Sequence, residues 1–360
     1  MPHAPVKIGF LGGGMISQIA HLPFYQVDPR CEIAAIAEER LSLHPALAAF
    51  AGAGEVTTDH RAMLARADID AVVISAPRPA TGPLTLAALE AGKHVLAEKP
   101  MAHTADQARR LVEAANRRGL IYAVGFMKLY DPGVARARAL LHEMVASGRL
   151  GRLLFARFYD FSKSYAHPVP PHARPQESRS TRFETWPVTP DWLPSAWNGL
   201  YPWFVNAAIH DVNLIHHFLG EDVVVRSAFA SGGDMLSATL MAGDVPVALE
   251  IAKTEAGRWL EGAEFLFEKG RIAVEIPSPM DTSAVSRVTL DDASAAEHAT
   301  QVETGLGWSF ALQARGFVDA LTGKEQPRAP AAMGLRDMEL TEAIFRSLGE
   351  VAPARSTAEA

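Results

Sequence analysis

The first 125 residues alternate short apolar runs with helical stretches, and this alternation constrains the fold more than any other feature of the chain. Alternation of this kind specifies a parallel sheet with helices on both faces. The predicted strands are Val6–Leu11, Ile33–Ala37, Ala71–Ala76, Val95–Ala97 and Ile121–Val124. We therefore expect an α/β protein in which residues 1–125 form a doubly wound parallel sheet.

The first predicted strand runs into three consecutive glycines, and a helical stretch follows them. Gly12 can take a tight turn, and Gly14 lets the backbone approach a pyrophosphate. The charge of that group would meet the first amides of the helix, those of Met15 and Ile16. A strand, a glycine-rich turn, a helix and a second strand in this order predict a dinucleotide-binding Rossmann domain rather than a plain tight turn.

The second predicted strand ends at Glu38, where a carboxylate would accept both ribose hydroxyls of an adenosine. A carboxylate there repels a 2′-phosphate, so we expect NAD as the cofactor, and the nearby Arg40 keeps NADP as the alternative. Ala76 and Pro77 end the third predicted strand at the same rim of the sheet and are predicted cofactor contacts. A simple strand terminator is the alternative interpretation for Pro77.

Lys99 lies between Glu98 and Pro100 at the end of another predicted strand. The residue before a proline is disfavoured in a helix, and a capping box from Thr104 to Gln107 predicts that the next helix begins later. Ligands bind beyond the carboxyl ends of the strands in open parallel sheets. We therefore expect Glu98 and Lys99 to contact the cofactor and Lys99 to transfer a proton; a surface lysine before a turn is the alternative.

After residue 125 the pattern changes, because a predicted helix over residues 132–147 precedes alternating segments typical of an open, mostly antiparallel sheet. We expect residues 126–351 to form an α+β domain for substrate binding and oligomerisation, followed by a tail over residues 352–360. The free face of an open sheet predicts a homodimer or homotetramer. A long insertion over residues 163–200 is rich in tryptophan, which could contact a sugar, a partner subunit or its own domain.

A predicted helix over residues 203–219 carries an unusual polar stripe. Asn206, His210, Asn213 and His217 recur at helical spacing, and Asp211 is the only formally charged side chain in this helix. A stripe of this kind predicts a polar cavity in which His210 gives or takes a proton. The alternatives are a structural histidine and a weaker possibility, a metal site of His210, Asp211, His216 and His217.

The composition of the 360 residues is that of an ordinary globular chain, with 48% hydrophobic residues and a net charge of −7. Cys31 is the only cysteine, so an intrachain disulfide is impossible. The chain has no long block of like charges, no apolar run of membrane-helix length and no basic-then-apolar leader. We expect a cytoplasmic protein whose partner is a small molecule rather than a nucleic acid or a membrane.

Together, the glycine loop, the Glu98-Lys99-Pro100 motif and the helix bearing His210 resemble the Gfo/Idh/MocA family of NAD(P)-dependent sugar and inositol dehydrogenases. The resemblance spans most of the chain and is strongest in DAVVISAP (70–77) and AALEAGKHVLAEKP (87–100). VGFMKLYD (124–131) resembles the substrate-facing junction of inositol dehydrogenases, which implies Lys128 and Tyr130 as substrate-binding residues. The resemblance also implies that Lys99 and His210 are catalytic.

The third catalytic position of that family, normally an aspartate, falls on Asn206 in this chain. A neutral amide can orient a hydroxyl but cannot take its proton, so general-base work falls to Lys99 or His210. Two further departures are Ser17, in place of a glycine or alanine, and Thr81, where many relatives carry a histidine. They bear on the detail of the pocket rather than on the fold.

We expect an enzyme that transfers a hydride between a ring carbon of a sugar, glycoside or cyclitol and the nicotinamide of NAD. One alternative is a redox-neutral enzyme that oxidises a glycoside transiently, eliminates a group and returns the hydride. The other is a dinucleotide-binding sensor or co-repressor without catalysis. Proton-transfer groups such as Lys99 and His210 argue against the sensor, although fold alone does not decide function.

Overall fold

The structure is a computed structural model that describes residues 4–52, 54–161, 168–177, 183–254, 258–293, 295 and 299–349. It divides into two compact units, each built from segments that are distant in sequence. Unit 1 comprises Met1–Tyr130, Val169–Val188 and Ser309–Leu335, and unit 2 comprises Asp131–Pro168, Thr189–Trp308 and Arg336–Ala360. The units therefore differ from the single division near residue 125 that the sequence pattern predicts.

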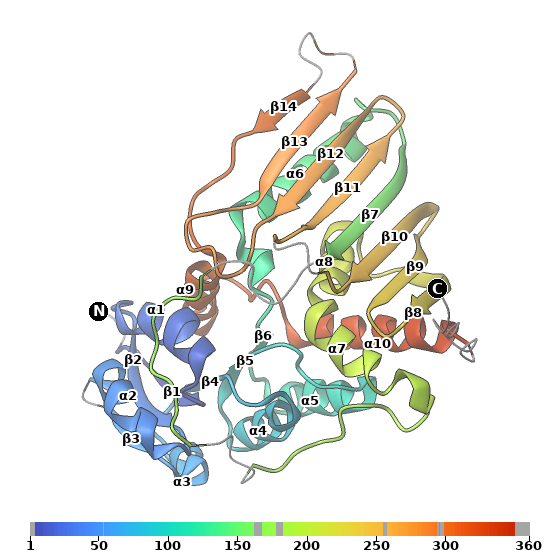
Figure 1. Cartoon of the computed structure of the whole chain (residues 1–360). Helices are drawn as coiled ribbons and strands as arrows, with labels where there is room; N and C mark the ends of the chain where they lie inside the picture. Colours follow the sequence, from blue (N-terminus) through green and yellow to red (C-terminus); the bar gives the residue numbers. More distant parts are fainter. Residues whose placement is uncertain are drawn as a thin grey trace. The chain divides into compact units, whose positions relative to one another are not determined.

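The sheet of unit 1 has six parallel strands in the described residues, in the order β3-β2-β1-β4-β5-β6 (Figure 1). The strands are β1 (Val6–Leu11), β2 (Cys31–Ala37), β3 (Glu55–Thr57), β4 (Ala71–Ile74), β5 (His94–Ala97) and β6 (Tyr122–Val124). The predicted doubly wound parallel sheet is confirmed. Because β1 lies between β2 and β4, the strand order reverses there, and ligands of such sheets bind at this point.

The helices of unit 1 follow its strands, apart from one that comes from the end of the chain. They are the π-helix η1 (Ser17–His21), α1 (Leu22–Gln26), the 3-10 helix η2 (Leu41–Leu43), α2 (His44–Ala51), α3 (His60–Ala65), α4 (Arg78–Glu90), α5 (Ala105–Arg118), the 3-10 helix η3 (Met127–Tyr130) and α9 (Ser309–Leu321). The predicted capping box begins α5, since Thr104 Oγ1 accepts from Gln107 N–H and Gln107 Oε1 accepts from His103 N–H.

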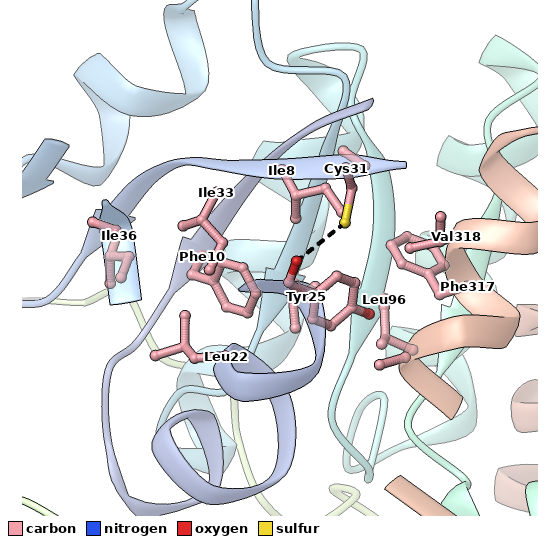
Figure 2. Packing of buried hydrophobic residues seen from close by; sticks show 14 of the residues in the cluster. Ile8, Phe10, Leu22, Tyr25, Cys31, Ile33, Ile36, Leu96, Phe317 and Val318 are labelled. Atoms are coloured by element: carbon pink, nitrogen blue, oxygen red, sulfur yellow. Dashed lines mark hydrogen bonds between the residues drawn. The ribbon is translucent and has the colours of Figure 1, made fainter. Parts of the chain in front are cut away.

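Figure 2 shows the core of unit 1, where side chains of β1, β2 and α1 meet side chains of α9. Phe10 and Tyr25 pack edge to face with ring centroids 5.4 Å apart, and Phe317 and Val318 of α9 belong to the same cluster. The Cys31 thiol donates to the Tyr25 carbonyl oxygen at 3.5 Å, and burial raises the pKa of Cys31 to about 12. The single cysteine is therefore a core residue rather than a reactive thiol.

The sheet of unit 2 has eight strands in the described residues, in the order β14-β13-β12-β11-β7-β10-β9-β8. They are β7 (Leu153–Phe161), β8 (Val223–Ser231), β9 (Met235–Ala242), β10 (Val245–Ala252), β11 (Glu261–Phe267), β12 (Gly270–Ile276), β13 (Arg287–Asp292) and β14 (Ala299–Val302). β7 and β10 are parallel and the other neighbours are antiparallel, which confirms the predicted mostly antiparallel sheet.

The remaining helices are α6 (Pro132–Ser147), the 3-10 helix η4 (Ser195–Trp197), α7 (Leu200–Ala207), α8 (Ile209–Leu219) and α10 (Ala331–Ser347). Helix α6 contacts β12 and β13, and α8 contacts β7. The burial of β7 alternates along the strand, with Ala156 and Phe158 buried and their neighbours partly exposed. The opposite face of the sheet includes Phe229, which is 62% exposed, and Leu266, which is 46% exposed.

Two tryptophans of the predicted insertion pack on their own units. Trp186 lies against Gly82 and Arg110 in unit 1, and the Arg346 guanidinium lies 3.8 Å from the ring centroid of Trp192 in unit 2. Residues 163–167 and 178–182 of the insertion, and the predicted tail 352–360, lie outside the described residues. In the part of the chain that the structure describes, no helix is long and apolar enough to cross a membrane.

Candidate active site

The loop after β1 has the geometry that a pyrophosphate-binding turn requires. Gly12 has φ +95°, and a Cβ atom there would collide with the carbonyl oxygen of Ser75 at the end of β4. A Cβ atom at Gly14 would meet only the Arg40 guanidinium, at 3.4 Å. Gly12 thus permits the close approach of two strand ends, and Gly14 leaves room above the loop for a ligand.

Helical structure begins at Met15 and Ile16, directly after this loop, and continues as the π-helix η1. Ser17 Oγ donates to the Gly12 carbonyl oxygen at 2.5 Å, so the residue that replaces the third glycine stabilises the turn through its hydroxyl. A π-helical turn is rare and occurs often at functional sites. The loop and the first helical amides can therefore hold the phosphates of a dinucleotide.

Glu38 follows β2, as predicted, and its carboxylate is already fully hydrogen-bonded. Oε1 accepts from the backbone N–H and Nε of Arg40, at 2.9 and 2.7 Å, and Oε2 accepts from Gly13 N–H and Arg40 Nη2, at 2.8 and 2.7 Å. Burial opposes ionisation, but these hydrogen bonds outweigh it and lower the pKa of Glu38. Glu38 is therefore an ionised carboxylate beside the glycine loop, closely paired with Arg40.

The carboxyl ends of β4 and β5 bring the other predicted cofactor contacts to the same edge of the sheet. Ser75 N–H donates to the Leu11 carbonyl oxygen, and Ala76 and Pro77 lead from there into α4. At the end of β5, Glu98 N–H donates to the Ile74 carbonyl oxygen, and Lys99 follows with a cis peptide bond to Pro100.

The Glu98 side chain is held from two sides. His21 Nε2, at the end of η1, lies 2.9 Å from Glu98 Oε1, and a Cβ atom at Gly125 would lie 3.2 Å from that same oxygen. The His21 side chain is 1% exposed and the Glu98 side chain 14%. This contact ties the loop that carries Lys99 to the helix that follows the glycine loop, and no local sequence pattern predicts it.

Lys128 and Tyr130, the predicted substrate-binding residues, lie on η3 and are both buried. Gln313 of α9, with its amide oxygen turned toward η3, accepts from Phe126 N–H and Met127 N–H. The Tyr130 hydroxyl accepts from Arg328 N–H at 3.2 Å, and the Arg328 guanidinium lies 5.2 Å from the ring centroid. These contacts fix η3 in place at the end of β6.

The predicted helix over residues 203–219 is two helices in the structure, and this corrects the single stripe that its spacing suggested. Helix α7 ends at Ala207, Ala208 forms a turn with φ −80° and ψ −5°, and α8 begins at Ile209. Asn206 thus lies on α7 and His210 on α8. His210 is 7% exposed, and Asp211, the only charged side chain of the pair of helices, is completely buried.

Asp337 of α10 is a buried acid that was not among the predicted residues. Asp337 Oδ1 lies 2.7 Å from His216 Nδ1, and Asp337 Oδ2 accepts from Asn213 Nδ2 at 2.8 Å. Burial raises the pKa of Asp337, against the effect of His216 and Asn213. Asn213 therefore anchors α8 to α10 rather than extending a polar stripe. The available signal was one carboxylate at helical spacing from the apolar residues Met333, Leu340 and Ile344.

The described part of the chain contains no group of three or more histidine, cysteine, aspartate or glutamate side chains that could hold a metal ion. His216 pairs with Asp337 instead. The geometry accordingly gives no support to the weaker metal-site alternative.

Comparison with known proteins identifies the N-terminal part of the chain. Residues 6–126 match the model of a family described as an oxidoreductase family with an NAD-binding Rossmann fold. The match covers the loop after β1, Glu38 and the Glu98-Lys99-Pro100 motif.

At least two curated relatives match over nearly the whole chain. One is the dTDP-3,4-didehydro-2,6-dideoxy-alpha-D-glucose 3-reductase of Actinomadura kijaniata, 28% identical over 94% of this chain and 95% of that protein. Another is the inositol 2-dehydrogenase of Rubrobacter xylanophilus, 28% identical over 97% of this chain and 92% of that protein. The D-glucoside 3-dehydrogenase of Escherichia coli is 33% identical over 42% of each chain.

Among solved structures, the fold matches KijD10, a 3-ketoreductase from Actinomadura kijaniata in complex with TDP-benzene and NADP. The TM-score is 0.73 at 23% identity, and the match covers 96% of this chain and 98% of that chain. At this identity the match supports the fold of both units.

Proposed function

Because the chain belongs to the Gfo/Idh/MocA family of oxidoreductases, we propose that it transfers a hydride between a ring carbon of a sugar, glycoside or cyclitol and the nicotinamide of NAD. The observation that carries the proposal is the position of Lys99 at the carboxyl edge of the unit 1 sheet. The same edge bears the loop after β1 and Glu38. An amine at this edge stands where a ligand of such a sheet binds.

The residues at this edge fit a dinucleotide. Gly12 and Gly14 leave the space that a pyrophosphate needs, and the amides of Met15 and Ile16 begin a helix there. Ala76, Pro77 and Glu98 lie at the ends of the neighbouring strands. Nicotinamide supplies the hydride acceptor or donor when it is bound.

The residues of the chain would handle the proton. When the alcohol carbon loses a hydride, its hydroxyl must lose a proton as the carbonyl forms, and we assign this proton to Lys99 or His210. Asn206 would orient the hydroxyl, because an amide can donate or accept a hydrogen bond but cannot take the proton. Lys128 and Tyr130 would hold other hydroxyls of the ring.

Glu38 supports NAD over NADP, since an ionised carboxylate repels a 2′-phosphate. Its lowered pKa keeps it charged at neutral pH. The guanidinium of Arg40 is the feature that favours NADP, and the A. kijaniata enzyme of known structure was crystallised with that cofactor.

Absorbance of reduced nicotinamide tests the proposal. Purified protein with NAD, and separately with NADP, is incubated with cyclitols, aldoses and glycosides. Growth of the band with one class of compound supports net dehydrogenation and identifies the substrate class. Dinucleotide binding without any signal would contradict net dehydrogenation and favour the redox-neutral alternative.

The open face of the unit 2 sheet supports a homodimer or homotetramer. Phe229 and Leu266 are large apolar side chains on this sheet that remain substantially exposed in the single chain. A second copy of the chain would cover such a face. Light scattering coupled to size-exclusion chromatography measures the mass of the assembly directly, and a monomer would contradict the expectation.

A further inference from the structure

A segment of the predicted insertion, which we call the strap (residues 169–177 and 183–188), lies against the nucleotide-binding edge of unit 1 (Figure 1). The side-chain amide of Gln18 accepts from Ala173 N–H at 2.9 Å and donates to the Ala173 carbonyl oxygen at 3.2 Å. The same Gln18 nitrogen donates to the Gly13 carbonyl oxygen at 2.8 Å. The strap is thus connected directly to the glycine loop.

A second contact connects the strap to the loop that follows β2. Glu177 accepts from the N–H of Ser42 at 2.9 Å and from its hydroxyl, and Gln176 N–H donates to the Ser42 hydroxyl oxygen at 3.0 Å. The hydrogen bonds from Ser42 lower the pKa of Glu177, so the strap carries a negative charge here. Ser42 is two residues from Arg40, so Glu177 is held by the same loop that carries the Glu38 and Arg40 pair.

Glu38 has no acceptor position left for a ribose in this arrangement. A carboxylate offers about four lone-pair positions, and Glu38 uses them for two N–H groups of the backbone and two of the Arg40 side chain. The Arg40 side chain occupies one position on each oxygen. If it moved away, each oxygen would regain one position, which matches the two hydroxyls of a ribose.

Arg40 has other carboxylates near it. Its pKa is raised first by the hydrogen bond to Glu38, and then, against the effect of burial, by the charges of Glu38, Glu177 and Glu39. The charges of three carboxylates thus act on one guanidinium, so Arg40 can leave Glu38 and still interact with a negative charge. Of these, Glu177 is the one on the strap, and it is already fixed by Ser42.

We propose that Arg40 exchanges Glu38 for Glu177 when NAD binds, so that the strap frees Glu38 for the ribose hydroxyls. This inference rests on the proposed NAD-dependent function and adds a specificity residue, Glu177, from outside the matched Rossmann segment. A 2′-phosphate would instead compete for Arg40 and meet the charge of Glu177. The strap therefore selects NAD over NADP.

Dissociation constants of NAD and NADP, measured by calorimetry on the full chain, test the exchange without a substrate. Glu177→Gln should weaken NAD binding about fivefold, the effect of an exposed charge pair, and should not weaken NADP binding. Glu184→Gln is the matched control, since Glu184 is an exposed glutamate of the same strap. It should change neither constant.

The Arg40→Ala variant tests whether Arg40 is the group with which Glu177 pairs. In that background Glu177→Gln should leave the NAD constant unchanged, because the guanidinium that Glu177 receives is gone. An equal loss of NAD affinity with and without Arg40, or equal behaviour of Glu177→Gln and Glu184→Gln, would overturn the exchange. Failure of the unmutated chain to bind either dinucleotide would instead contradict the proposed function.

Discussion

His21 Nε2 lies 2.9 Å from Glu98 Oε1, and this hydrogen bond joins the π-helix after the glycine loop to the motif that bears Lys99. Both side chains are largely shielded from water. The glycine loop and the Glu98-Lys99-Pro100 motif are thereby connected through one contact.

Replacing His21 with phenylalanine should destabilise unit 1. The ring volume is kept, but Glu98 loses its partner in a mostly buried position, which costs about 1–3 kcal/mol. Urea unfolding measures the loss, and Glu98→Gln, whose amide can still bond to His21, should lose less. Stability of His21→Phe within about 0.5 kcal/mol of the unmutated chain would contradict a structural role for the contact.

Replacing Lys99 with methionine should keep NAD binding and lower turnover by about 10²–10⁴, the contribution of a general acid or base. Calorimetry gives the binding and absorbance of reduced nicotinamide gives the turnover. Lys269→Met, at an exposed lysine in a turn of unit 2, is the control and should keep both. Normal turnover of Lys99→Met would refute the assignment of Lys99.

Replacing Gly12 with alanine should cost about 3 kcal/mol or more, because a positive φ and a collision with Ser75 add together. Gly92→Ala separates the two effects, since Gly92 has φ +76° and no atom within 4 Å of the added carbon. It should cost about 1 kcal/mol. Equal losses of unfolding free energy in the two variants would show that the collision has no effect.

Mild acid should destabilise the chain through His103. Burial, helped by the charge of Arg78, lowers the pKa of His103 to about 4. In the unfolded chain His103 takes up a proton near pH 6.5, whereas in the folded chain the ring stays neutral to a lower pH. The stability that depends on the neutral ring is therefore fully present above pH 6.5. It is lost as the pH falls toward 4, by about 2 kcal/mol between pH 7 and pH 5.

Urea unfolding at the two pH values checks this for the unmutated chain and for His103→Gln. The glutamine variant should lose less stability on acidification. Parallel losses in both proteins would assign the acid sensitivity to other groups.

Replacing Asp337 with alanine should cost about 3 kcal/mol or more, because His216 and Asn213 would lose their partner in a completely buried site. Thermal unfolding compares it with Asp244→Ala, a change at an exposed turn residue between β9 and β10. A small shift for both variants would mean that α8 does not depend on α10.

The parts of the fold that local patterns encode were predictable. β1 and α6 have the predicted bounds, because each is a run of regular periodicity between clear breaks. β3 was missed, since it has three residues, none of them buried, and therefore lacks an apolar run. The break at Ala208 was missed because alanine favours a helix and nothing local marks the turn.

The site was predictable only residue by residue. The glycine loop, Glu38 and Lys99 follow strands, so their common edge follows from the sheet. The long-range contacts around these residues could not be predicted in this way. Glu177 is 135 residues from its partner Ser42 along the chain, and Asp337 is 121 residues from its partner His216. Contacts at such separations depend on the tertiary arrangement and leave no periodic signal.

The contribution of α9 to the core of unit 1 has a consequence for biosynthesis. Phe317 and Val318 pack with residues of β1 and β2, although they come near the end of the 360-residue chain. A ribosome adding about 5–20 residues per second would make the first strands well before these side chains emerge. The nascent nucleotide-binding unit would remain incompletely packed during that interval, and would depend on chaperones or on rapid late closure to avoid aggregation.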